Sequence, residues 1–161
     1  MEKIAVFPGS FDPFTIGHQS IVNRALPLFD KIIIAIGYNT GKKTYMTLEN
    51  RLRLIQDVFE GNIKIEVQHY EGLTVDFCTQ MDARYLLRGL RTAADFEYER
   101  AIGQVNKAMK PEIESVFLLT APEYTPVNST IVRDILMHGG DARKFLPAGI
   151  DISKYIVDDK V

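Results

Sequence analysis

A glycine-containing loop near the N-terminus carries the first residues that could do chemistry. The stretch PGSFDPFTIGH, residues 8–18, follows an apolar run. Gly9 would allow close approach of a ligand to the backbone, Ser10 offers a hydroxyl, and His18 falls where the next helix is expected to begin. The free N–H groups at a helix start favour an anion, and an imidazole can donate a hydrogen bond to a phosphate oxygen. The loop is therefore a candidate phosphate site, although glycine and proline here would also build a tight turn without a ligand.

Four basic residues are expected on the same edge of the fold as that loop. Arg88 and Arg91, in LLRGLR, end one apolar run, and Lys42 and Lys43 follow another. A planar guanidinium matches the oxygens of a phosphate, although each of these side chains could instead be a solvated loop charge. Because the carboxyl ends of parallel strands share one edge, this concentration of cations in a chain of net charge −2 favours an anionic ligand.

A third candidate segment is YTPVNSTIVRDIL, residues 124–136. Asn128, Ser129 and Thr130 stand just before a predicted helix, where they could cap it. The same position would present hydroxyl and N–H groups to a second phosphate.

Several common catalytic sites do not fit the sequence. The single cysteine, Cys78, lies in an apolar run and is expected in the core, which leaves no multi-cysteine zinc pattern. His69 and His138 have no ligand partners at metal-binding spacing and are expected at the surface or in packing contacts, so no protein metal site is predicted. There is no Gly-x-Ser-x-Gly elbow and no Walker loop, and Ser10 has no evident triad partners.

The remaining inventory favours one kind of chemistry. Cations, hydroxyls and helix N-termini, without a covalent nucleophile or a clear general base, suit phosphoryl or nucleotidyl transfer, in which positioning and charge stabilisation do most of the work. A phosphate monoester, with a second pKa near ~6, is largely a dianion at neutral pH and can attack without a base.

The rest of the sequence predicts the elements that position these groups. Apolar runs of strand length lie at residues 3–7, 31–37, 63–70, 85–90 and 115–121. Helix-period segments lie at residues 18–28, 47–59, 74–81, 93–108 and 129–137. Thr47 is placed to cap its helix, and Gly61 and Gly139 stand where helices should stop. The alternation predicts a doubly wound, Rossmann-like α/β fold: a five-stranded parallel sheet of order 3-2-1-4-5 with helices on both faces. The loops after the first and fourth strands should then face each other.

Length and composition predict one domain. The chain has 161 residues, 46% of them hydrophobic, and we expect short helices at about 140–161 to pack on the sheet. A net charge of −2 gives no basic field for nucleic acid or an anionic membrane, and no apolar run reaches ~18 residues. The N-terminal MEKIAVF enters a strand directly. We therefore expect a soluble, cytoplasmic protein that binds neither nucleic acid nor membrane.

The motifs also carry a resemblance. Thr15, Gly17 and His18 form a Thr-x-Gly-His signature similar to that of the nucleotidyltransferase superfamily related in fold to class I aminoacyl-tRNA synthetases. KK at 42–43, RGLRTAADFEYE at 88–99, ESVFL at 114–118 and NSTIVRDI at 128–135 extend the resemblance to the phosphopantetheine adenylyltransferase family over nearly the whole chain. The first signature indicates only the superfamily, whereas R-G-L-R with D-F-E-Y-E is specific to this family.

This resemblance implies a single nucleotidyltransferase domain over residues 1–161 that acts in coenzyme A biosynthesis. Members join ATP and 4′-phosphopantetheine to give dephospho-coenzyme A and pyrophosphate, with Mg²⁺, and commonly assemble as a homohexamer. The magnesium ion would arrive mainly on the triphosphate oxygens of ATP.

Residue roles follow by matching position. The phosphopantetheine ligands would be Ser10, Lys42, Thr74 and Arg88. The ATP ligands would be Ser10, Phe11, His18, Gly89, Arg91, Glu99, Tyr124, Asn128, Ser129 and Thr130, with the loop from Tyr124 to Thr130 closing over the nucleotide. The catalytic group would be His18, Lys42, Arg91 and Ser129, with His18 stabilising the pentavalent transition state.

The chain departs from the family pattern in two places. Members often carry Trp and a serine run where this chain has Tyr124 and NST at 128–130, and Thr is commoner than Ser10. Asn128 and Thr130 keep hydrogen-bonding capacity, so we expect altered affinity rather than lost activity from this segment. Ser10 keeps the hydroxyl and lacks only a methyl group, and we expect no functional effect from that change. Two alternatives remain open: a related nucleotidyltransferase with another phosphate acceptor, such as nicotinamide mononucleotide or glycerol phosphate, and a non-catalytic nucleotide-binding protein.

Overall fold

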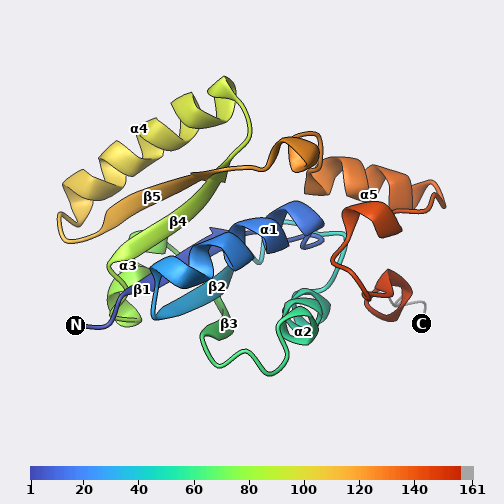
Figure 1. The fold of residues 1–161 in the computed structure, drawn as a ribbon, viewed down its shortest axis with the longest axis horizontal. Helices are drawn as coiled ribbons and strands as arrows, with labels where there is room; N and C mark the ends of the chain where they lie inside the picture. The colour runs from blue at the N-terminus through green and yellow to red at the C-terminus, as the bar shows by residue number, and fades with distance from the viewer. Residues whose placement is uncertain (157–161) are drawn as a thin grey trace.

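The computed structural model, which describes residues 1–156, is built on a parallel sheet with helices on both faces (Figure 1). The strands are β1 (Ile4–Gly9), β2 (Lys31–Gly37), β3 (Ile65–Tyr70), β4 (Tyr85–Leu90) and β5 (Glu114–Leu119). The helices are α1 (Ile16–Ala25), α2 (Leu48–Val58), α3 (Thr74–Gln80), α4 (Ala93–Met109) and α5 (Ser129–Met137). All strand pairs are parallel, and the order β3-β2-β1-β4-β5 confirms the predicted topology.

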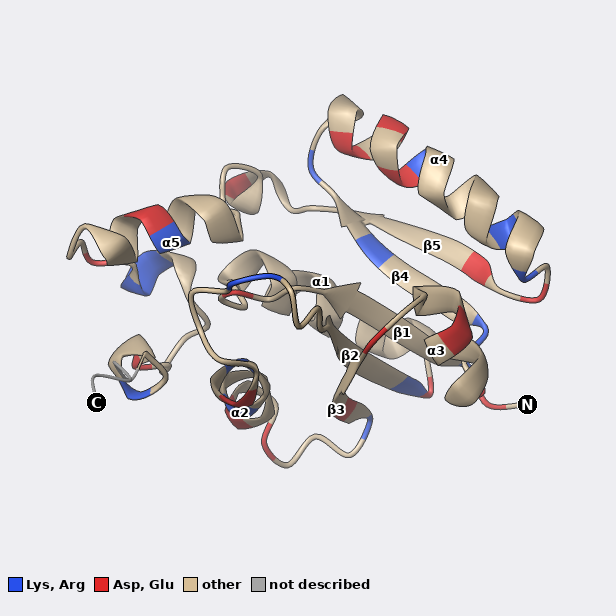
Figure 2. Cartoon of the chain, turned by 180° about the vertical axis from the view of Figure 1, so that it is seen from behind, with Lys and Arg blue, Asp and Glu red and all other residues tan. Residues whose placement is uncertain are grey.

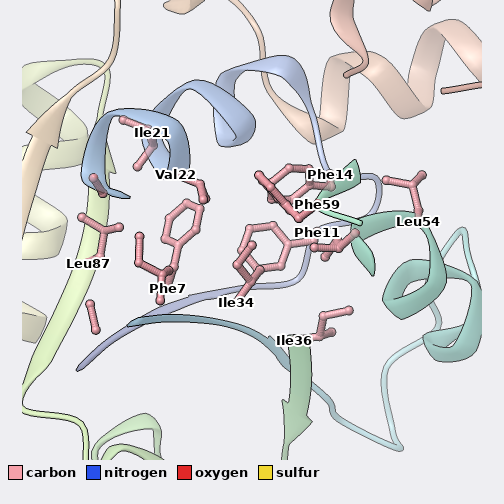
Figure 3. Packing of buried hydrophobic residues seen from close by; sticks show 14 of the residues in the cluster. Phe7, Phe11, Phe14, Ile21, Val22, Ile34, Ile36, Leu54, Phe59 and Leu87 are labelled. Atoms are coloured by element: carbon pink, nitrogen blue, oxygen red, sulfur yellow. The ribbon is translucent and has the colours of Figure 1, made fainter. Parts of the chain in front are cut away.

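The two faces of the sheet bury different residues because side chains alternate along a strand. Ala5 and Phe7 of β1 join Ile34 of β2, α1 and α2 in one core cluster, whereas Val6 and Ile33 join α3 in the other. Figure 3 shows the first cluster between the sheet and the helices α1 and α2. The almost unbroken apolar runs of β1 and β2 thus reflect strands buried on both faces.

The first helix begins earlier than predicted. Thr15 is its N-cap, and its hydroxyl accepts a hydrogen bond from the His18 N–H, so helix α1 starts at Ile16 rather than at His18. A short 3-10 helix over Leu26–Leu28 ends it, with Pro27 inside that turn. His18 therefore lies within the first helical turn, where its side chain can fold back on the cap.

The sheet opens between β1 and β4. Along this border the register pairs Ala5 with Tyr85 and Val6 with Leu86, whereas β1 stays paired with β2 as far as Gly9. Beyond these two positions the two strands separate, at the switch point where the strand order reverses. Ligands in open parallel sheets bind at this kind of crevice.

The helix α4 differs from the other helices that cover the sheet. Glu99 is its only buried residue, and Tyr98, Ile102, Val105 and Met109 are exposed on it. Figure 1 shows α4 running along β4 and β5 at one side of the molecule. This part of the surface is unusually apolar for an outer helix.

The C-terminal segment packs against α2 and the core. It contains 3-10 helices over Arg143–Phe145 and Ile152–Lys154, and residues 157–161 of the predicted 140–161 region lie outside the described residues. Arg53 of α2 donates to the carbonyl of Lys154 and lies 5.0 Å from the ring of Tyr155, while Tyr155 donates to Asp57 of α2. Tyr155 also belongs to the core cluster that contains Ala5 and Phe7 of β1 and Ile34 of β2.

Cysteine and surface histidines lie as predicted. Cys78 is fully buried, and burial raises the pKa of its thiol to about 12, which suits a core residue and not a nucleophile. His69 and His138 are exposed. None of the helices in residues 1–156 combines the length and the apolar character needed to span a membrane.

Candidate active site

The loop between β1 and α1 is held by side chains from three other elements. Four side chains donate to backbone carbonyl oxygens of residues 8–13. The bonds run from Arg88 Nη1 to Pro8 at 2.8 Å, from Arg51 Nη1 to Ser10 at 2.8 Å, from Arg133 Nη1 to Asp12 at 2.9 Å and from Ser129 Oγ to Pro13 at 2.8 Å. The donors come from β4, α2 and α5. A trans peptide points its N–H away from its C=O. Because the Ser10 carbonyl faces Arg51, the N–H of Phe11 points away from Arg51.

The carboxylate of Asp12 ties the same loop to the segment before α2. Its two oxygens accept hydrogen bonds from the N–H groups of Tyr45 and Met46, both at 2.8 Å. This segment follows Lys42 and Lys43. The Asp12 side chain therefore fixes the point at which the lysine loop rejoins the fold.

Gly9 and Phe11 depend on each other. Phe11 has a φ of +46°, in the left-handed region that is uncommon for a residue other than glycine, and its ring is only 3% exposed. A Cβ at Gly9 would stand 2.8 Å from the Phe11 ring. Gly9 thus makes room for this ring, and it also lines both cavities described below, so close approach of a ligand there stays a prediction.

His18 is a neutral hydrogen-bond donor in this structure. The N–H of Thr15 donates to His18 Nδ1 at 2.9 Å, so Nδ1 is unprotonated and the ring proton is on Nε2. Desolvation by burial, together with the charges of Arg88 and Arg91, lowers the pKa of His18 to about 3. Its ring centroid lies 5.0 Å from that of Phe11, in edge contact. The imidazole is thus kept uncharged at neutral pH with its Nε2–H available.

A first cavity of about 290 Å³ lies where the loop, α1, β4 and α5 meet. Its lining includes nine of the predicted site residues: Ser10, Phe11, His18, Arg88, Gly89, Arg91, Glu99, Asn128 and Ser129. These residues come from four separate parts of the chain. The shared edge of the parallel sheet brings them together, as expected from the carboxyl-end rule. Figure 2 shows basic residues in β4 and in the connection from β4 to α4.

A second cavity of about 340 Å³ lies between α4 and the sheet. Apolar side chains from three elements line it, Leu86, Ile102 and Phe117, together with the polar side chains of Thr74 and Asn106. The Thr74 hydroxyl lies 2.7 Å from the Tyr70 hydroxyl, which also lines this cavity. The two cavities share Pro8, Gly9, Ser10, Arg88 and Glu99. They therefore form two adjoining compartments with a common border.

The border contains an ion pair. Arg88 donates from Nε to Glu99 Oε2 at 3.0 Å and from Nη2 to Glu99 Oε1 at 2.6 Å. Its Nη1 donates to the Pro8 carbonyl across the gap between β1 and β4. Three of its five N–H groups are thus engaged, and two remain for a ligand. The Glu99 carboxylate fixes the guanidinium in a defined plane between the compartments.

The N-terminus of α5 is capped by a side chain, which is one of the two roles that the sequence allowed for this segment. The Asn128 side chain accepts a hydrogen bond from the Ile131 N–H at 2.9 Å, which confirms the capping interpretation for this residue. The Ser129 hydroxyl donates to Pro13, so it is already committed as a donor. Thr130 is exposed and accepts from Arg133. A phosphate at this helix end would thus meet backbone N–H groups rather than the serine hydroxyl.

Not all predicted site residues line the two cavities. Lys42 and Lys43 are exposed in the loop before Met46 and line neither cavity. Tyr124 is partly buried and packs beside Val127 in a small cluster with α5. The structure therefore places the lysines and the tyrosine at the periphery of the site.

Three supporting residues were not selected from the sequence. These are Asp12 of the loop, whose carboxylate accepts from the segment before α2, and Arg51 and Arg133, which donate to carbonyls of the loop; the contacts span 33 to 121 residues of sequence. One signal existed for Arg51, which stands three and four positions before the core residues Leu54 and Ile55 of α2. A charged residue at a core position predicts a buried partner.

The carboxylates near the cavities do not form a metal site of their own. Glu99 is paired with Arg88, Asp95 is paired with Arg91 at 3.1 Å, and Asp12 accepts from two backbone N–H groups. No group of three or more potential ligand side chains that could hold a metal ion occurs among residues 1–156.

Comparison with known proteins shows extensive similarity. The sequence model of the cytidylyltransferase-like family matches residues 6–135. The phosphopantetheine adenylyltransferase of Flavobacterium johnsoniae is 48% identical over 150 residues, which cover 93% of this chain and 98% of that protein. Those of Christiangramia forsetii, at 49% over 145 residues, and Bacteroides thetaiotaomicron, at 47% over 149 residues, cover 90% and 92% of this chain and 95% and 98% of their own length.

Solved structures share the fold. A putative nicotinate-nucleotide adenylyltransferase from Vibrio parahaemolyticus superposes with a TM-score of 0.68 at 19% identity, over 91% of this chain and 94% of that chain. A bifunctional NMN adenylyltransferase/ADP ribose pyrophosphatase from Francisella tularensis gives 0.67 at 18% identity, over 94% of this chain and 46% of that chain. At these identities the likeness concerns the fold alone.

Proposed function

The chain belongs to the cytidylyltransferase-like family and, within it, to the phosphopantetheine adenylyltransferases, and on this premise we propose that it transfers the adenylyl group of ATP to 4′-phosphopantetheine. The products are dephospho-coenzyme A and pyrophosphate, in a step of coenzyme A biosynthesis. The observation that carries the proposal is the pair of adjoining cavities with a basic, loop-lined border. When one substrate transfers a group to another, the two reacting phosphates must meet, and a border shared by two cavities allows this.

The chemistry of each cavity favours one substrate. The first cavity offers His18, Arg91 and the N-terminus of α5, which suit a triphosphate. The second cavity offers apolar walls such as Ile102 and Phe117 with a few polar groups, which suit the flexible pantetheine arm. The acceptor phosphate would then lie at the border beside Arg88.

The reaction follows from these positions. The acceptor phosphate, with a second pKa near ~6, is largely a dianion at neutral pH and attacks the α-phosphorus of ATP without a base. The new bond joins an acceptor oxygen to this phosphorus, while the bond from the α-phosphorus to the oxygen that bridges the α- and β-phosphates breaks and pyrophosphate leaves with that oxygen. Negative charge grows on the oxygens of the transferring group, where His18 donates from Nε2 and Arg91 supplies positive charge.

The remaining roles stay part of the proposal. Ser10 would contact both substrates, and Phe11, Gly89 and Glu99 would face ATP. Thr74 and Lys42 would act on the acceptor side; Lys42 would have to approach from its exposed loop. The contribution of Ser129 would come through its backbone N–H, because its hydroxyl donates to Pro13.

Tyr124, Asn128 and Thr130, from the loop before α5 and the first turn of that helix, would act on the nucleotide side. Asn128 lines the first cavity, whereas Tyr124 and Thr130 do not. We propose that they contact ATP when the loop from Tyr124 to Thr130 closes over it. A magnesium ion carried by the ATP phosphates would add positive charge there, because the carboxylates near the cavities are already paired.

A homohexamer in the cytoplasm is also part of the proposal. The exposed apolar residues Tyr98, Ile102, Val105 and Met109 of α4 support association through this helix. Native mass spectrometry should give six times the 18.2 kDa chain. Val105→Glu should reduce that mass, whereas a wild-type monomer would contradict the assembly. Antibody staining of fractionated cells would test the compartment.

The activity test measures pyrophosphate release from ATP with different acceptors. We expect release with 4′-phosphopantetheine and none above background with nicotinamide mononucleotide, glycerol 3-phosphate or no acceptor. Release with another acceptor instead would favour the related nucleotidyltransferase, and ATP binding without release would favour the non-catalytic alternative. Arg88→Ala should chiefly raise KM for phosphopantetheine and Arg91→Ala KM for ATP; equal effects on both substrates would contradict the assignment of the cavities.

A further inference from the structure

Arg51 is a charged residue in the core of the protein. It is 2% exposed on the buried face of α2, beside Leu54 and Ile55. Its Nε has no hydrogen-bond partner within residues 1–156. Burial lowers its pKa, and the charge of Asp12 acts against that shift. Burying a charge in this way is unfavourable unless the charge is paired or hydrogen-bonded.

The contact that Arg51 makes is with the loop of the site. Its Nη1 donates to the Ser10 carbonyl at 2.8 Å, across 41 residues of sequence. Arg51 lines neither cavity, whereas Ser10 lines both. The Arg51 side chain therefore lies behind the loop, on the side away from the substrates.

Holding this carbonyl sets the direction of the next N–H. The Ser10–Phe11 peptide leads into a residue at φ +46°, which is not the conformation that phenylalanine prefers. The Phe11 ring in turn lies against the His18 ring, at 5.0 Å between centroids. A rotation of this peptide would thus move the Phe11 N–H, the Phe11 ring and the surroundings of His18 together.

We propose that Arg51 is a positioning residue for the transfer reaction: from behind the loop it fixes the Ser10–Phe11 peptide, so that the Phe11 N–H and the His18 ring face the border of the two cavities. The role rests on the proposed adenylyl transfer. Arg88 and Arg133 hold the neighbouring carbonyls of Pro8 and Asp12. Arg51 holds the central one, between the nucleotide side and the acceptor side.

The kinetic test compares Arg51→Met with Arg53→Met. Arg53 lies on the same helix, but it is exposed and donates to the Lys154 carbonyl of the C-terminal segment. Arg53→Met therefore removes a guanidinium from α2 without removing a contact to the loop. We expect Arg51→Met to lower kcat by about 100-fold with less than about threefold change in either KM, because the loop donor acts on the transition state. Arg53→Met should keep both constants. An Arg51→Met enzyme with wild-type kcat per folded molecule overturns the proposal, whatever its melting temperature.

A second variant covers a failure to fold. Arg51→Lys keeps the cation and one donor but loses the planar fork, and we expect it to fold and to lose about tenfold in kcat. A wild-type kcat in Arg51→Lys would show that a buried cation is enough, which overturns the claim that the guanidinium fixes the peptide.

A spectroscopic readout separates this proposal from the proposed function. In wild-type protein the ¹⁵N shifts of His18 should report the Nε2–H tautomer and should not titrate between pH 5 and about 8, because its pKa is lowered to about 3. In Arg51→Met or Arg51→Lys the ring should become hydrated and titrate nearer 6.5, while Arg53→Met should match wild type. If wild-type protein transfers no adenylyl group, the proposed function fails, and the His18 titration alone then decides whether Arg51 supports the loop. A silent His18 in both Arg51 variants overturns that support.

Discussion

Replacing His18 by Gln gives the sharpest test of the proposed chemistry. The change keeps an amide N–H donor but removes the imidazole ring, whose Nε2–H the Thr15 contact at Nδ1 fixes in direction. Loss of one oriented donor at a developing charge costs about 10²–10³ in kcat, or about 2.7–4 kcal/mol. We therefore expect kcat to fall by this factor in pyrophosphate release, with KM for ATP changed much less. His69→Gln, at an exposed position of β3, is the matched control and should keep the wild-type rate.

The pH dependence of the rate adds an independent check. Because the pKa of His18 is lowered to about 3, the residue does not change charge between pH 5 and about 8. A fall in rate on the acid side should come from the acceptor phosphate, whose second pKa is near ~6. The profiles of wild type and His18→Gln should then be parallel and differ only in height. A change in rate near pH 6.5 that is present in wild type and absent in His18→Gln would refute the proposal that His18 acts as a neutral hydrogen-bond donor.

The same shift affects stability in a defined direction. The unfolded chain binds a proton on His18 below its ordinary pKa of 6.5, whereas the folded chain binds it only near 3. Stability linked to His18 is therefore complete above 6.5 and is lost as the pH falls from 6.5 toward 3. Urea unfolding should show a steeper loss in wild type than in His18→Gln across this window. Equal slopes would show that the ring is already hydrated in the folded state.

Three further substitutions follow from the contacts of the loop and the border. Gly9→Ala should destabilise the protein by about 1–3 kcal/mol in urea unfolding, because its Cβ would stand 2.8 Å from the Phe11 ring. Unchanged stability would mean that this ring has room to move. Glu99→Gln should lower the melting temperature and raise KM for phosphopantetheine, because Arg88 loses the carboxylate that orients it; an unchanged KM would contradict the role of the pair. Ser129→Ala should cost about 1 kcal/mol of stability but less than about tenfold in kcat/KM for ATP, since its hydroxyl donates to the protein. A loss above a hundredfold would show direct phosphate binding by the hydroxyl.

The fold was largely predictable because its signals are local. Continuous apolar runs and helix-period segments predicted the five strands, their order and the helices on both faces. The errors are at boundaries where a neighbour decides. β1 continues to Gly9 because Pro8 and Gly9 remain paired with Ala35 and Ile36 of β2, and a proline is accepted where β1 has parted from β4.

The meeting of several predicted site residues at one edge of the sheet was predictable, whereas their contacts with one another were not. The rule that ligands bind at the carboxyl ends of parallel strands brought the loop, β4 and the start of α5 to one place. That Ser129 donates to Pro13, or that Arg51 donates to Ser10, depends on packing between segments 116 and 41 residues apart. A single sequence carries no record of such distances. The individual roles toward ATP and phosphopantetheine stay predictions.

The separation of β1 from β4 divides the sheet into two groups of strands that share few backbone pairs. On one side stand β3, β2 and β1, on the other β4 and β5, and the register joins them at Ala5–Tyr85 and Val6–Leu86. At the open end of this seam the guanidinium of Arg88 takes the place of the next backbone rung, by donating to Pro8. A molecule bound across the opening between β1 and β4 would connect the two groups of strands. Substrate binding would therefore stiffen the whole sheet and not only its carboxyl edge.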